Sequence, residues 1–241
     1  MKINKKTQIA GENVAAASSQ IRLERNTPGR AIFTISQPEH APQPGQTISH
    51  SASTASGEWR TLFAGYIERV VPTGHNVFQI LARENAAVLN QRLNINARHC
   101  LPADLLKTIS AQTGVVFVMP ESDWTKKTAA RFQHIGTGYD ALDQLIKIWE
   151  IPGGIWHQQP DGRVYVGEYT SSVINKTIEI PAEKFAAKAV TGGTLLLIPR
   201  LRPGVKIKFG DNVQTITAIE ITGDTMRLEW QRLTRKIRAT Q

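Results

Sequence analysis

TLFAGYIERVVPTGHNVFQILARENAAVLNQRL, residues 61–93, is the stretch of sequence that decides the fold. Two short apolar runs, LFAGYI and VFQIL, flank a segment that contains the turn formers Pro72 and Gly74, and this pattern predicts a β-hairpin. In the last 12 residues of the stretch the apolar positions recur at helical spacing, so we expect the second strand to pass directly into a helix. The stretch therefore predicts the edge of a small β-barrel capped by a helix.

The composition is typical of a soluble globular protein, with 41% hydrophobic and 20% charged residues. No apolar run approaches the roughly 20 residues that span a bilayer, so we expect no membrane segment. The basic start of the chain is not followed by the apolar core of a signal peptide, which predicts cytoplasmic synthesis. The lone Cys100 can form neither an internal disulfide nor a CxxC metal site. The length of 241 residues fits one elongated domain or two compact modules of roughly 100 to 150 residues each, and we favour two modules.

The formal net charge of +9 is concentrated at the two ends of the chain. Residues 1–100 hold 11 basic and 6 acidic residues (+5), residues 101–198 hold 9 and 10 (−1), and residues 199–241 hold 9 and 4 (+5). This balance fits a nucleic acid, an acidic partner chain or a solvated surface, and charge alone does not choose among them.

The segments before the central hairpin also have the pattern of β structure. Residues 1–20 predict an extended arm or an edge strand, and two alternating segments within residues 20–36 predict a hairpin. The aliphatic side chains expected to face the core there are Leu23, Ile32 and Ile35. Residues 37–57 are rich in Pro, Gly and Ser, which predicts a long exposed interaction loop.

The middle of the chain predicts a small α+β unit. Residues 102–113 and 139–149 have helical periodicity, and residues 115–119 and 131–135 read as strands. The turn at Asp161 and Gly162 then predicts a hairpin between residues 155–158 and residues 163–167. Later short strands at a spacing of about ten residues predict a second closed barrel. These strands are expected at residues 177–180, 194–198, 205–209, 213–221 and 226–230.

The predicted fold class is therefore α+β, mainly β, with two small β-barrel domains joined by an α+β insert. The expected domains are a first barrel with a C-terminal helix (residues 1–93), the α+β insert (94–160), a second barrel (161–231) and a basic C-terminal tail (232–241).

No constellation of catalytic, metal-binding or cofactor-binding residues is evident. The six histidines lack paired spacing, and neither a GxSxG elbow nor a Walker loop occurs. Asp140 and Asp143 stand at the start of a predicted helix, where carboxylates stabilise the helix dipole. His99 and Cys100 are adjacent, so their side chains do not point at one another. We expect no enzyme activity, no metal and no cofactor.

Two alternatives to a purely structural role stay open. In an OB-type nucleic-acid binder, Trp230, Phe209 and Tyr165 would stack on bases, although these positions also suit core packing. The basic residues that could face a partner or DNA are Arg232, Arg235, Lys236 and Arg238. In a degraded hydrolase, a pocket would gather His157 with Asp161 or Glu168.

Four segments, taken in order, resemble the baseplate and tail hub proteins of long-tailed bacteriophages. Phe63, Gly65 and Ile67 lie in a motif similar to the strand that opens the first hub barrel. The later segments are a helix, Thr-Gly, strand and Pro in residues 101–120, a Phe strand and Gly-x-x-x-Asp-Ala-Leu helix in residues 132–145, and an aromatic hairpin with Asp-Gly in residues 155–167. The hub part of type VI secretion spike proteins is built alike, so the resemblance covers those machines as well.

This resemblance implies a structural hub rather than a catalyst. It implies a homotrimer whose two barrels per chain form a ring that adapts a sixfold tail tube to a threefold central spike or fibre and lets DNA pass. The implied partners are the tube or distal tail protein and the spike or fibre, with possible passive contact with phage DNA. The implied location is the tail tip or baseplate of the virion, after assembly in the host cytoplasm. Residues 37–57 and the two termini are the expected contacts.

Overall fold

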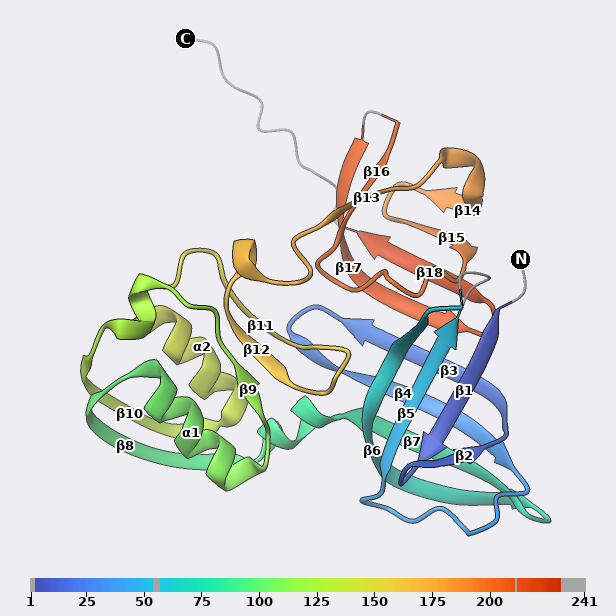
Figure 1. The fold of residues 1–241 in the computed structure, drawn as a ribbon, viewed down its shortest axis with the longest axis horizontal. Coiled ribbons are helices and arrows are strands. Elements are labelled where there is room, and N and C mark those ends of the chain that lie inside the picture. The colour runs from blue at the N-terminus through green and yellow to red at the C-terminus, as the bar shows by residue number, and fades with distance from the viewer. Residues whose placement is uncertain (1–2, 54–56, 211, 231–241) are drawn as a thin grey trace.

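The computed structural model describes residues 3–53, 57–210 and 212–230 (Figure 1). It has two parts, each with its own hydrophobic core. We call residues 3–84 and 169–230 the β body, and residues 85–168 the α+β module. In Figure 1 the β body holds the blue, cyan, orange and red strands, and the α+β module is the green and yellow part beside it.

The β body is built from strands at both ends of the chain. The N-terminal strands are β1 (Asn4–Ile9), β2 (Glu12–Val14), β3 (Ala16–Glu24), β4 (Thr27–Ser36), β5 (Thr47–Ser53), β6 (Trp59–Gly74) and β7 (Val77–Glu84). The C-terminal strands are β13 (Thr177–Glu179), β14 (Phe185–Ala189), β15 (Gly192–Leu196), β16 (Lys206–Phe209), β17 (Asn212–Thr222) and β18 (Thr225–Trp230). Two short 3-10 helices, Tyr169–Ser171 and Ala182–Lys184, precede and interrupt the second group.

The two groups of strands belong to one sheet, because β3 pairs with β17 in an antiparallel ladder from Gln20 opposite Thr222 to Glu24 opposite Ala218. The strand order is β14-β15-β18-β17-β3-β4-β7-β6-β5-β1-β2, and β16 with β13 branches from β17. This path is open among the described residues. The mainly β, α+β class is therefore confirmed, whereas two closed barrels are not confirmed.

One continuous core fills the β body. Strand β4 shows how the sequence sets it, since Ala31, Phe33 and Ile35 point inward while Ile32 is 39% exposed. The expectation that Ile32 faces the core is therefore wrong, because the inward positions alternate from Ala31 with a period of two. Phe33 packs edge-on against Phe63 at a ring separation of 6.1 Å.

The α+β module consists of two helices and two small sheets. Its elements are a 3-10 helix (Asn85–Asn90), β8 (Arg92–Cys100), α1 (Pro102–Thr113), β9 (Phe117–Val118), a 3-10 helix (Asp123–Lys126), β10 (Ala129–Thr137), α2 (Gly138–Ile148), β11 (Gly154–Gln158) and β12 (Val164–Glu168). Strands β8 and β10 form an antiparallel ribbon. Leu93, Ile95 and Phe132 on this ribbon share a core with α1 and α2, so the helices cover one face of it.

Both α-helices begin and end at the residues that their sequences indicate. Pro102 opens α1, and Gly114 ends it with a positive φ of 74°. Thr137 caps α2 in a reciprocal pair with Asp140, whose carboxylate accepts from the Thr137 backbone N–H. No helix among the described residues is long and apolar enough to cross a membrane.

The helix expected over residues 82–93 is present only as a 3-10 helix over half of that length. Strand β7 continues to Glu84, a six-residue 3-10 helix follows, and β8 begins at Arg92. The spacing that suggested a helix comes from Ala86 and Leu89, which are buried in the 3-10 helix, and from Leu93, which is buried in β8. The turn of the central hairpin also lies later than expected, at His75 and Asn76, because β6 stays paired with β7 as far as Gly74.

The loop expected over residues 37–57 contains a strand instead. Strand β5 lies between β1 and β6, and Ile48, His50 and Ala52 are its inward side chains. The composition of β5 is largely polar, so the alternation of its inward side chains gave little apolar signal in the sequence. Strand β14 was not expected at all, whereas the other C-terminal strands lie close to their predicted positions. The strand expected over residues 115–119 is reduced to Phe117–Val118, which pairs in parallel with β12.

Candidate functional site

The β6–β7 hairpin holds the three residues of the predicted barrel motif. Phe63 and Ile67 are buried on β6, and Gly65 between them lies opposite Glu84 of β7. A Cβ atom on Gly65 would stand 1.9 Å from the carbonyl oxygen of Arg83, a distance that no side chain tolerates. The motif therefore fixes a close approach of two strands, and its role in assembly stays a prediction.

The end of this hairpin joins the N-terminal and C-terminal parts of the β body. The Glu84 carboxylate is buried and accepts a hydrogen bond of 2.6 Å from the Gly29 backbone N–H. Burial raises the pKa of Glu84, and the charge of Arg202 partly opposes this rise. Arg202 in turn donates from Nη2 to the Thr61 carbonyl oxygen at 2.6 Å. Burial lowers the pKa of Arg202, against the attraction of Glu84.

Gln158 is one of the side chains that tie the α+β module to the β body. Its Nε2 donates to the carbonyl oxygen of Ala64 on β6 at 2.8 Å. Its Oε1 accepts from the backbone N–H of Ala86 at 2.9 Å. Gln158 thus satisfies backbone groups on both sides of the junction, which fixes the module against the sheet.

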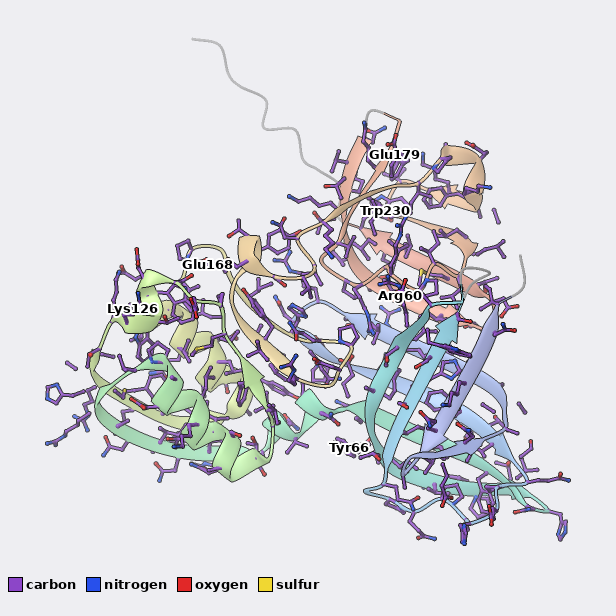
Figure 2. The ribbon with its side chains drawn as sticks, in the orientation of Figure 1. Arg60, Tyr66, Lys126, Glu168, Glu179 and Trp230 are labelled. Carbon is purple, nitrogen blue, oxygen red and sulfur yellow. The ribbon has the colours of Figure 1, made fainter. Side chains whose placement is uncertain are left out.

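A cleft of about 840 Å³ lies where the module meets both groups of β-body strands. Its lining includes the β3–β4 turn, the start of β6 and the β11–β12 hairpin. Two large apolar side chains in this lining are open to solvent, Trp59 at 49% and Val173 at 51% exposed. Figure 2 shows Arg60, the neighbour of Trp59, at the end of β6 that faces the C-terminal strands. Exposed apolar groups beside a cleft are typical of a protein contact surface.

The cleft does not bring together the residues that a hydrolase would need. His157 Nε2 and the buried Ser172 Oγ are 2.8 Å apart, and burial lowers the pKa of His157. Asp161, however, forms an ion pair of 2.7 Å with Arg163. Glu168 accepts hydrogen bonds from two serine hydroxyls and does not contact His157. Among the described residues His157 therefore has no carboxylate to orient it.

The remaining candidates for chemistry have structural roles. Asp140 caps α2, and hydrogen bonds from Thr137 lower the pKa of Asp140. Asp143 accepts a hydrogen bond of 3.0 Å from the indole N–H of Trp156. Cys100 is buried, and burial raises the pKa of its thiol, which opposes activation. Within the part of the chain that the structure describes, no three or more His, Cys, Asp and Glu side chains gather as for a metal ion.

The expected aromatic platform is inside the protein. Trp230, Phe209 and Tyr165 are 3%, 5% and 3% exposed, so they cannot stack on bases. Phe209 and Trp230 pack together with ring centroids 5.5 Å apart. The basic residues Arg232, Arg235, Lys236 and Arg238 lie outside the described residues.

Sequence reasoning missed Glu84, Arg202 and Gln158. A signal for Glu84 was present, because this charged residue continues the inward-facing alternation of Ile80 and Ala82 on β7. Arg202 and Gln158 lie in a turn and a hairpin with no local pattern that indicates their partners. Their hydrogen bonds reach residues 141 and 94 positions away.

These features define a class of fold, an open antiparallel β body that carries a two-helix α+β module. Bacteriophage tail proteins have a fold of this class. The 43 kDa tail protein of prophage MuSo2 from Shewanella oneidensis matches with a TM-score of 0.73, at 11% identity, over 96% of this chain and 98% of its own. A tail protein from Neisseria meningitidis matches with a TM-score of 0.68, at 12% identity, over 95% of this chain and 96% of its own.

Two further similarities complete the comparison. An Escherichia coli component of the type VI secretion system, described as similar in structure to T4 tail proteins gp27 and gp5, matches with a TM-score of 0.63, at 15% identity, over 95% of this chain and 77% of its own. An uncharacterised 58.7 kDa protein of Haemophilus phage HP1 is 29% identical over 237 residues, 97% of this chain. The chain spans 43% of the length of that phage relative. No family model matches the chain. The resemblance predicted from the sequence is thus confirmed as a likeness of fold.

Proposed function

We propose that this chain is a structural protein of a phage tail, and specifically its hub. The observation that carries this proposal is the likeness to two tail proteins over at least 95% of both chains in each pair. A likeness of that extent extends over nearly the whole of this chain. The phage relative in sequence agrees with it.

In this proposal three copies of the chain form a ring. The N-terminal and C-terminal strands of each β body supply two units, so a trimer presents six units to a sixfold tail tube and three copies to a central spike or fibre. DNA passes through the ring. The partners are the tube or distal tail protein and the spike, and the location is the tail tip of the virion, after assembly in the host cytoplasm. The chain does no catalysis, because such a role requires complementary surfaces rather than a reactive site.

The surface we assign to the contact between subunits is the mouth of the cleft around Trp59 and Val173. These two side chains are half exposed and line the same hollow, whereas scattered single apolar residues on a surface carry no such meaning. The sheet path also ends at β2 and β14, and a strand at the end of a sheet offers backbone groups to a neighbouring chain.

The test is the mass of the chain in solution, alone and mixed with tail tube protein, by analytical ultracentrifugation. The proposal expects a trimer, at least in the mixture. Val173→Asp should weaken assembly, while the control Val116→Asp should not, because Val116 has a similar exposure of 57% but lies on the α+β module. A monomer in both conditions, or equal effects of the two variants, would contradict the proposal.

A further inference from the structure

The ribbon formed by β8 and β10 has one face covered by helices and one face open. The open face carries mainly hydrogen-bond donors, namely three arginines and three amides, around a single aliphatic residue. Its members, all exposed, are Arg92, Asn94, Asn96, Arg98, Arg131, Gln133 and Ile135. We call these seven residues the ribbon face. In Figure 1 the ribbon runs along the edge of the α+β module, from the 3-10 helix next to the β body to the left end of the molecule.

Charge is segregated within the module. Residues 85–168 hold 8 basic and 8 acidic residues, yet neither β8 nor β10 contains an acidic residue. The acidic side chains lie on the helices and connecting segments, such as Asp104 on α1 and Asp143 on α2. The module as a whole is nearly neutral, so the charge of +3 on the ribbon face is a local feature.

Two of the arginines oppose each other directly. Arg98 and Arg131 are cross-strand partners in the β8–β10 register. Side chains at such positions have Cβ atoms about 5 Å apart, and like charges there destabilise a sheet. No ion pair compensates Arg92, Arg98 or Arg131 among the described residues. Because the repulsion between Arg98 and Arg131 lowers the stability of the sheet and no carboxylate offsets it, the pair is better explained by binding of an external anion than by a contribution to folding.

The amides on the ribbon face are also without internal partners. The side chains of Asn94, Asn96 and Gln133 make no hydrogen bond within the part of the chain that the structure describes. Amide and guanidinium groups together supply donors for phosphate and for base edges, and amides supply acceptors as well. Ile135, at 59% exposed, is the single large apolar side chain of the face.

We propose that the ribbon face binds double-stranded DNA. Protein interfaces have an apolar and often aromatic centre, which this face lacks, whereas interfaces with DNA are polar and positively charged. A two-stranded antiparallel ribbon fits the major groove, which is about 12 Å wide. Arg92 and Arg98 are six residues apart on β8, about 20 Å at strand spacing, which corresponds to about six base-pair steps. This inference does not rest on the role as a tail hub.

The test measures binding of the full chain to a fluorescent duplex of about 20 base pairs by anisotropy, between about 50 and 200 mM salt. The variant Arg92→Ser, Arg98→Ser, Arg131→Ser removes the charge of the ribbon face. Loss of three phosphate contacts should lower the slope of log K against log salt by about 2.7 and weaken binding at least tenfold at low salt. The matched control is Arg30→Ser, Arg69→Ser, Arg227→Ser, which removes three exposed arginines of the β body.

The control should change affinity by less than about threefold and leave the salt slope unchanged within error. Both triple variants keep the C-terminal basic residues and lose three arginines, so they differ only in where on the surface the charge is removed. Circular dichroism with thermal unfolding verifies that each variant folds. Equal losses in the two variants, or no binding by the wild-type chain at low salt, would overturn the proposal. So would displacement of the duplex by a poly-glutamate peptide of equal charge, which would indicate an acidic protein partner instead.

Discussion

Lowering the pH is expected to destabilise this protein through His50. The ring lies inside the β body and is 2% exposed, packed against Phe33 at a centroid distance of 5.4 Å. Its Nδ1 is 2.8 Å from the Thr7 hydroxyl, and its Nε2 is buried with no partner among the described residues. Burial, with a smaller contribution from the charge of Lys5, lowers the pKa of His50 from 6.5 to about 4.

The sign and size of the effect follow from proton linkage. The unfolded chain takes up a proton on His50 near pH 6.5, and the folded chain does so only near pH 4. Between these pH values the unfolded state binds more protons than the folded state. The contribution of the neutral His50 ring to the free energy of unfolding is therefore complete above about pH 6.5 and is lost as the pH falls toward 4. The difference between the two pKa values corresponds to about 3 kcal/mol. That is a large share of the roughly 5 to 15 kcal/mol by which a typical domain is stable.

The assay is urea unfolding at a series of pH values from about 7 to 4.5, where His50→Asn removes the titrating ring. Asparagine still offers the Thr7 hydroxyl a polar partner, so the variant should be less stable but should lose about 2 kcal/mol less than the wild type over this range. His75→Asn, at an exposed position in the β6–β7 turn, is the control and should keep the wild-type dependence. If His50→Asn keeps the wild-type dependence too, the reasoning is refuted.

Three further substitutions test other contacts. Gly65→Ala should lower the free energy of unfolding in urea by about 3 kcal/mol or more, because the new Cβ would meet a carbonyl oxygen of β7. The control Gly74→Ala should lower it far less, because no atom lies nearer than 3.8 Å to the new Cβ. Similar losses in the two variants would contradict the close approach at Gly65. Gln158→Leu should cost about 1 to 3 kcal/mol and speed hydrogen exchange at the junction between module and β body, and unchanged exchange would show that other contacts hold it. Arg98→Glu should raise stability by about 0.2 to 1 kcal/mol by placing a carboxylate opposite Arg131, while weakening any DNA binding; a loss of stability would show that the repulsion is not felt.

The sequence allowed the secondary structure to be predicted best where a pattern and its turn coincide. The hairpin around Asp161 and Gly162, the helix opened by Pro102 and the strands after residue 190 are of this kind. Strand β5 could not be predicted from its composition, because two of its inward side chains are His50 and Ala52, which carry little apolar signal. Only the neighbours β1 and β6 make that segment a strand.

The ribbon face and the cleft could largely not be predicted from the sequence. A strand was predicted over part of β10, but no element was predicted over residues 94–100, so Arg98 and Arg131 could not be placed opposite each other. The cleft is lined by segments distant in the chain, and Trp59 and Val173 approach it from different parts of the β body. The resemblance to tail proteins was detectable because it depends on the order of local motifs, which needs no knowledge of long-range contacts.

The pairing of β3 with β17 has a consequence for how the protein is made. Gln20 and Glu220 are hydrogen-bonded although they are 200 residues apart, so the edge of β3 emerges from the ribosome long before its partner is synthesised. Until then the nascent N-terminal strands have an uncovered side, which invites association between neighbouring chains on a polysome. Distant pairing of this kind also slows folding, because the chain closes a long loop first. The sheet is therefore completed only after β17 has been synthesised and has paired with β3.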